Sequence, residues 1–290
     1  FIIVNSKNAE GKIFKFVTVI FTPLLIYGII EYITGFNIFH NRSISVPIYE
    51  DWHVIDSFDR IRTSFPHPPG YSFALLIFLP LYLYYFMKKK EKENVYFYGF
   101  IILLFLINLL LTFTRITWIA VAIQLIFFLF LFRDKKMLRF ALPLGIVLGI
   151  ISVVMSSRII TRAVTVDESV LGRFDLFWYG FSIFKAYPVF GSGIGTFIEL
   201  SVFKFGYTIA AHGDYMLMFA ETGVFGGLGY LIILFSMLVF VVKKFKENYF
   251  AKVAFLMIIS FMIYGITGNA LANSHIFWGL LGIYNGIIVR

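Results

Sequence analysis

Uninterrupted apolar runs about 20 residues long constrain this sequence more than any other feature. They lie near residues 13–31, 70–87, 94–113, 115–132, 138–156, 214–242, 250–267 and 274–289. A helix of that length crosses a bilayer, whereas the strands of a membrane barrel would alternate apolar and polar residues. Since 60% of the residues are hydrophobic and only 14% are charged, a water-soluble fold is excluded. The sequence predicts an all-α, polytopic integral membrane protein with about eight transmembrane helices in a single domain, residues 1–290.

The distribution of positive charge indicates which ends of these helices face the cytoplasm. With a cytoplasmic N-terminus, most of the Lys and Arg residues, including the run at 88–92, fall in short inside segments. That distribution agrees with the positive-inside rule. The net charge of +9 therefore reports membrane orientation, and no nucleic-acid partner is expected. Position 1 is Phe, and no signal-peptide pattern precedes the first run, so we expect a longer protein with further N-terminal helices.

Two expected outer segments, about 32–69 and 157–213, are longer than ordinary connections. Most of their basic residues are arginines, which can grip phosphate at two points, and all five histidines also lie outside. In the second segment an apolar stripe runs over residues 174–184, and Pro188 with the following glycines ends the helix. We expect the loop 157–213 to form short amphipathic helices along the outer bilayer surface.

Three sequence elements follow one another in this loop and the next span. The first is Gly172-Arg173 with aromatic residues after it, the second is Pro188-Val189-Phe190-Gly191-Ser192-Gly193, and the third begins at His212 and includes Tyr215 and Glu221. Together with Thr112-Phe113-Thr114-Arg115 and a looser segment at Arg62, they resemble the O-antigen ligase and polymerase family of integral membrane glycosyltransferases. The resemblance covers roughly residues 55–240. It departs from the family pattern at Gly213, where Asn is frequent, and at Thr114, where Ser is usual.

The resemblance implies transfer of a glycan from a polyprenyl (undecaprenyl) diphosphate carrier to an acceptor hydroxyl. The acceptor would be lipid A-core or a growing glycan, and the reaction would occur on the periplasmic side of a bacterial inner membrane, within lipopolysaccharide or polysaccharide biosynthesis. No cofactor and no metal are expected. Arginine suits a diphosphate leaving group, and histidine suits a base near neutral pH. The predicted catalytic residues are His212, Arg173 and Arg115, and the predicted substrate-binding residues are Arg60, Arg62, Tyr215, Glu221, Gly191 and Gly193.

Several of these residues also have purely structural interpretations. An arginine at a helix end often only contacts lipid head groups, which applies to Arg115 and equally to Arg60 and Arg62. Glu221 lies about two turns into an apolar run, where we favour an ion pair with an arginine. Gly191 and Gly193 are more typical of a turn than of a phosphate cradle.

Alternative functions share the same sequence features. A repeat-unit polymerase of the same family would perform the same chemistry on a different acceptor. A transporter or flippase of lipid-linked glycans would also need arginines and many spans, but it would gather polar residues near the bilayer midplane. A structural scaffold would not need the spacing of His and Arg. The gathering of polar residues in an outer loop favours the enzyme.

Overall fold

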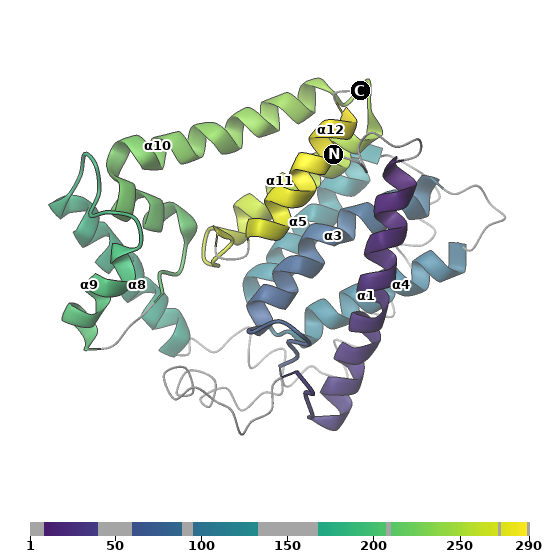
Figure 1. The fold of residues 1–290 in the computed structure, drawn as a ribbon, viewed down its shortest axis with the longest axis horizontal. Helices are drawn as coiled ribbons and strands as arrows, with labels where there is room; N and C mark the ends of the chain where they lie inside the picture. The colour runs from purple at the N-terminus through teal and green to yellow at the C-terminus, as the bar shows by residue number, and fades with distance from the viewer. Residues whose placement is uncertain are drawn as a thin grey trace. The chain divides into compact units, whose positions relative to one another are not determined.

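The computed structural model is helical in the part of the chain that it describes, and nine helices are assigned there. The described residues are 9–39, 60–88, 95–132, 168–206, 210–271 and 274–288. The chain divides into two compact units, residues 1–164 and residues 165–289, which are treated separately below. Figure 1 shows the helices of each unit.

The first unit contains four helices with α3 at its centre. They are α1 (Ala9–Thr34), α3 (Pro68–Lys88), α4 (Val95–Leu111) and α5 (Arg115–Phe132). Almost every side chain of α3 is buried, because α4 and α5 pack against it. Helix α1 packs on α4 and keeps an exposed apolar side, as a helix facing lipid would.

Buried polar side chains connect the helices of this unit. The Tyr71 hydroxyl donates to Asn108 Oδ1 at 3.0 Å, and Asn108 Nδ2 donates to the Leu25 carbonyl at 3.0 Å. Gln124 Nε2 donates to the Leu76 carbonyl at 3.0 Å. An unpaired polar group inside a bilayer costs several kcal/mol, so these bonds pair the atoms that they join where water is absent.

The second unit contains α8 (Glu168–Ala186), α9 (Thr196–Phe205), α10 (Asp214–Lys243), α11 (Tyr249–Tyr264) and α12 (Ser274–Ile288). Helices α8 and α9 pack against the beginning of α10, and α11 packs between α10 and α12. A small core joins the first three helices, formed by Leu176, Tyr179, Ile183, Phe197, Ala211 and Ala220. The expected helix over 174–184, broken after Pro188, is confirmed by α8.

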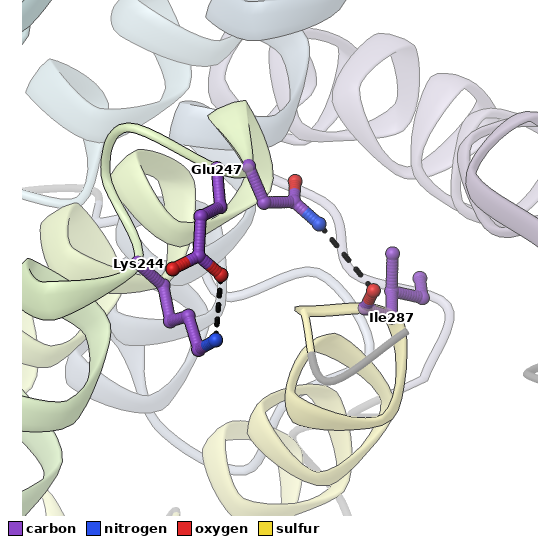
Figure 2. Close-up of polar contacts among 4 residues, drawn as sticks. Lys244, Glu247 and Ile287 are labelled. Carbon is purple, nitrogen blue, oxygen red and sulfur yellow. Dashed lines mark hydrogen bonds and ion pairs between the residues drawn. The ribbon is translucent and has the colours of Figure 1, made fainter.

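A polar turn connects α10 to α11. Lys244 Nζ lies 2.6 Å from Glu247 Oε2, as Figure 2 shows. Asn248 begins α11 by accepting the Phe250 N–H at 2.8 Å, and its Nδ2 donates to the Ile287 carbonyl near the end of α12 at 3.3 Å (Figure 2). The side chain of Asn248 therefore fixes where α11 starts and joins it to α12.

Four of the eight expected spans are helices long and apolar enough to cross a membrane. They are Gly11–Thr34, Pro68–Met87, Arg115–Phe132 and Asp214–Lys243. The expected span at 138–156 lies outside the described residues. Helices α4, α11 and α12 are apolar but have 17, 16 and 15 residues, fewer than the about 20 of a typical crossing. Four candidate spans make this a multi-pass membrane protein.

Candidate active site

His212 lies in a turn that rests on the segment between α11 and α12. The Asp214 N–H donates to the Gly265 carbonyl at 2.8 Å, and Asp214 Oδ2 accepts the Leu271 N–H at 3.1 Å. Gly213 has a φ of +114°, and a Cβ at this position would lie 2.8 Å from the Ile266 carbonyl oxygen. Only glycine fits this close approach without a shift of the backbone. The position of His212 is thus set by contacts with residues 265–271.

The surroundings of His212 keep its imidazole neutral. Burial, reinforced by the positive charge of Arg173, lowers the pKa of His212 from 6.5 to about 4. Arg173 comes from α8 and His212 precedes α10, so packing of these two helices has brought the two predicted catalytic residues within electrostatic range. A neutral imidazole at physiological pH is in the form that accepts a proton.

Helix α8 fixes the position of Arg173 through its buried side. Leu176, Tyr179 and Ile183 recur at helical spacing and pack into the core shared with α9 and α10. Arg173 is half-buried at the edge of this side, while Asp175 is exposed. Arg173 therefore extends from a helix whose position is fixed by its packing.

The loop between α8 and α9 docks onto a break in α10. At Gly223 the backbone has φ 66° and ψ −165°, which interrupts the helix. The loop supplies hydrogen bonds at this break: Ser192 N–H donates to the Ala220 carbonyl at 3.0 Å and Gly193 N–H donates to the Glu221 carbonyl at 2.9 Å. In return, the Val224 N–H donates to the Pro188 carbonyl at 2.8 Å. Groups that the break would leave without partners are thus satisfied by the loop.

Close contact between the two backbones explains the glycines of this loop. A Cβ on Gly191 would lie 2.2 Å from the Glu221 carbonyl carbon, and one on Gly223 would lie 2.3 Å from the Val189 carbonyl oxygen. The Gly191 N–H donates to the Tyr187 carbonyl at 3.0 Å. Because the N–H groups of residues 191 to 193 all donate within the protein, these contacts give Gly191 and Gly193 a structural role. Their part in substrate binding stays a prediction.

Glu221 connects this loop to α9. Its Oε1 accepts the Phe197 N–H at 3.0 Å, and its side chain is buried. The N-cap residue of α9, Gly195, has no side chain to accept such a bond, so Glu221 caps the helix from another element. The sequence favoured an ion pair between Glu221 and an arginine. In the described part of the chain, the hydrogen-bond partner of this carboxylate is instead the main-chain N–H of Phe197.

The hydroxyl of Tyr215 is also hydrogen-bonded to another residue of the protein. Its hydroxyl donates to the Met262 carbonyl in α11 at 2.7 Å, and its ring packs near Tyr230. This bond joins the start of α10 to α11, close to the turn that carries His212. Its predicted role in substrate binding remains a prediction.

The remaining three predicted arginines belong to the first unit. Arg60 Nε donates to the Thr112 carbonyl at 2.9 Å, and its Nη2 donates to Thr114 Oγ1 at 3.2 Å. This two-point contact holds the turn directly before Arg115, which begins α5. Arg62 Nη1 donates to the Pro66 carbonyl at 3.2 Å on the exposed side of the segment. Arg60 and the Arg115 turn are thus brought together, although they are far apart in sequence.

Glu31 of α1 holds the segment that carries Arg60 and Arg62. Its Oε2 accepts the Thr63 N–H at 2.8 Å, and its Oε1 accepts a bond from Asn37 at 2.6 Å. Glu31 is buried, and its charge is satisfied by these donors. Sequence reasoning had assigned no role to this residue.

Residues 100–231 match the family model described as O-antigen ligase. This part of the chain is similar to the O-antigen ligase family. The matched segment includes Arg115, Arg173, His212 and Glu221, whereas Arg60 and Arg62 precede it. No curated protein matches the chain. This similarity, together with the apolar helices, indicates a glycosyltransferase-like enzyme at a coarse level in a multi-pass membrane protein.

Two parts of the His212 turn were missed by sequence reasoning. No role was assigned to Asp214 from the sequence, yet this residue is 1% exposed and bonded to the segment after α11. That segment, residues 265–271, lies beyond the family match, and the sequence places its first three residues in the expected span 250–267 and the others in the connection that follows. An acidic residue at the start of an apolar run, two residues after the candidate base, was the available signal in the sequence.

Proposed function

We propose that this protein transfers a glycan from a polyprenyl diphosphate carrier to an acceptor hydroxyl, with the active site facing the periplasm of a bacterial inner membrane. The acceptor is lipid A-core in the ligase version of the proposal and a growing glycan in the polymerase version. The observations that carry the proposal are the match of residues 100–231 to the O-antigen ligase family model and the packing of α8 on α10, which brings Arg173 within electrostatic range of His212.

The proposed reaction proceeds with His212 as base. The acceptor oxygen attacks the anomeric carbon while its proton passes to the imidazole. The bond from the anomeric carbon to the diphosphate oxygen breaks, and its electron pair leaves with the polyprenyl diphosphate. Arg173 is assigned to the diphosphate, where fixed positive charge stabilises the departing anion. The catalytic role proposed for Arg115 rests on the sequence motif around it.

Binding of the donor should adjust the basicity of His212. In the donor-free protein, the charge of Arg173 disfavours the imidazolium ion. A diphosphate on Arg173 would offset that charge and raise the pKa of His212, so the base would strengthen when the donor is in place. This sequence of events reconciles a low pKa in the free protein with a role as proton acceptor.

The remaining predicted residues support these roles. Arg60 holds the turn before Arg115, and Glu221, Gly191 and Gly193 hold the loop that docks beside α9 and α10. Arg62 and Tyr215 are proposed to contact the glycan or the diphosphate. Membrane lipids surround the protein in this proposal, and neither a cofactor nor a metal takes part.

The deciding experiment follows the fate of the donor. Purified protein is incubated with a radiolabelled polyprenyl-diphosphate glycan and, in separate reactions, with lipid A-core or with the same glycan as acceptor. Release of free polyprenyl diphosphate together with a labelled product supports the enzyme, and the acceptor that is used distinguishes ligase from polymerase. Donor movement across vesicles without release would support a transporter.

Variants then test the residue roles. His212→Ala is expected to bind the donor normally and to lose transfer about 10²–10⁴-fold, as for a lost acid–base group. His275→Ala is the matched control, because His275 is exposed on α12. Arg173→Ala and Arg115→Ala should each nearly abolish transfer, and Arg173→Lys should restore part of it. Full activity of Arg173→Ala at normal membrane levels would contradict the proposal.

A further inference from the structure

Helix α10 consists of two segments that differ in length and in their content of charged residues. Its 30 residues would extend about 45 Å if straight, longer than a hydrocarbon core about 30 Å thick. The break at Gly223 leaves residues 224–243, about 20 residues, which is the length of one crossing. No charged residue occurs from 224 to 242, whereas Asp214 and Glu221 lie in the segment before the break. The segment before Gly223 therefore carries the acidic residues, and the segment after it has the length and composition of one membrane crossing.

The docked loop continues the exposed apolar surface of the second segment. Phe190 is 78% exposed and Phe225 is 67% exposed, and their ring centroids lie 5.9 Å apart. Phe225 begins a series of exposed apolar side chains along α10 that includes Leu228, Ile233 and Val239. The loop therefore adds Phe190 to the end of a surface that a membrane span presents to lipid.

Helix α8 carries an exposed aromatic face on its side opposite the core. Phe174, Phe177 and Trp178 are exposed, and Trp178 makes edge-to-face contacts with Phe177 and Phe181. Lys185 Nζ lies 4.8 Å from the centroid of the Phe181 ring. Aromatic rings with a long cationic side chain at the edge are typical of helices that lie at a membrane interface.

We propose that the bilayer surface on the His212 side crosses α10 at Gly223, and that Phe190 and the aromatic face of α8 are seated in that leaflet. The partner of this face is lipid. Its continuity with the exposed surface of α10 supports lipid over a second protein copy, since a spanning helix with mostly exposed side chains faces acyl chains. Glu221, Asp214 and His212 then lie at head-group depth.

A depth measurement tests both parts of this inference without any activity assay. The chain contains no cysteine, so single cysteines can be introduced and labelled with bimane. The protein is reconstituted in phosphatidylcholine–phosphatidylglycerol vesicles that carry a nitroxide at carbon 5 or carbon 12 of the acyl chain. Aqueous iodide is used in parallel.

Positions on α10 distinguish the two possible boundaries. If the crossing is residues 224–243, label at Ile233→Cys is the deepest and Phe225→Cys is shallower than Val239→Cys. If the crossing begins at Asp214, Leu228→Cys is the deepest and Phe225→Cys is deeper than Val239→Cys. The second order would overturn the assignment of the boundary.

Positions on the hairpin test its contact with lipid. Trp178→Cys and Phe190→Cys should be quenched more by the carbon-5 nitroxide than by iodide, and Asp175→Cys on the polar flank of α8 should show the reverse. Val189→Cys, also exposed, serves as a second probe of the loop if Phe190→Cys does not fold. Iodide quenching at Trp178 and Phe190 equal to that at Asp175 would place the face in water. Protection from both quenchers would place it against protein. Either result would refute the lipid contact.

Discussion

The Glu221 carboxylate of α10 accepts the main-chain N–H of Phe197 in α9 at 3.0 Å, and both residues are buried. The same residue accepts the Gly193 N–H at its carbonyl, so Glu221 holds the loop and the helix that follows it. A single residue near the break in α10 thereby sets the path of the chain between α8 and α9. The placement of Arg173 beside His212 depends on this packing.

Substitutions of Glu221 should show whether its hydrogen bond to α9 or its negative charge matters for activity. Glu221→Gln keeps an oxygen that can accept the Phe197 N–H, so we expect near-normal stability and most of the transfer activity. Glu221→Ala removes the acceptor and should cost about 0.5–2 kcal/mol of unfolding free energy, measured by thermal unfolding in detergent. Glu199→Ala, on the exposed side of α9, is the control. Loss of transfer in a stable Glu221→Gln protein would instead indicate that the charge contacts substrate.

The titration of His212 should follow the charge of Arg173. With a pKa near 4 in the donor-free protein, His212 is neutral throughout the neutral range, so kcat/KM for the donor, which reports the free protein, should stay level at neutral pH and fall only as the pH approaches about 4. Arg173→Gln removes one cause of the low pKa and should raise the pKa, although burial, the larger cause, still keeps it below 6.5. NMR titration of labelled histidine, assigned with His212→Gln, measures this shift directly. An unchanged pKa in Arg173→Gln would argue against proximity of the two residues.

Alanine at three glycines should distinguish close contact from backbone strain. Gly191→Ala and Gly223→Ala place a methyl group against backbone atoms, so each should cost at least about 2 kcal/mol of unfolding free energy. Gly195→Ala also sits at a positive φ but has open space around it, and its cost should be only the strain of about 1–2 kcal/mol. Thermal unfolding of the three variants in one detergent gives the comparison. Equal losses at all three positions would mean that the loop does not dock as described.

Arg60 and Arg62 should differ in their effect on donor binding. Arg60→Lys cannot make both contacts with Thr112 and Thr114, so the turn before Arg115 should loosen and donor affinity should fall by about tenfold or more. Arg62→Ala removes an exposed contact to the Pro66 carbonyl and should change affinity less than about threefold. Titration of the purified variants with lipid-linked donor measures both. A larger loss in Arg62→Ala would identify Arg62 as the direct contact.

Local sequence properties determined the class of fold and the nature of the candidate residues. The apolar runs around 13–31, 70–87 and 115–132 predicted candidate spans within a few residues, because transfer of about 20 apolar side chains into lipid decides such helices almost alone. The stripe over 174–184 predicted α8 for a similar reason, since its periodicity is local. Arg173 and His212 were identified by their place in motifs that resemble those of the O-antigen ligase family.

Tertiary structure decided how the polar groups are satisfied and therefore what each residue contributes. The run 214–242 gave no sign of a break at Gly223, because the break is stabilised by a loop from earlier in the chain. The partner of Glu221, the contact of Arg60 with Thr112 and the anchoring of Asp214 on residues 265–271 likewise join segments that are distant in sequence. The low pKa of His212 has the same origin. Hydropathy is a property of each segment alone, whereas hydrogen bonding, burial and charge proximity arise only when segments pack together.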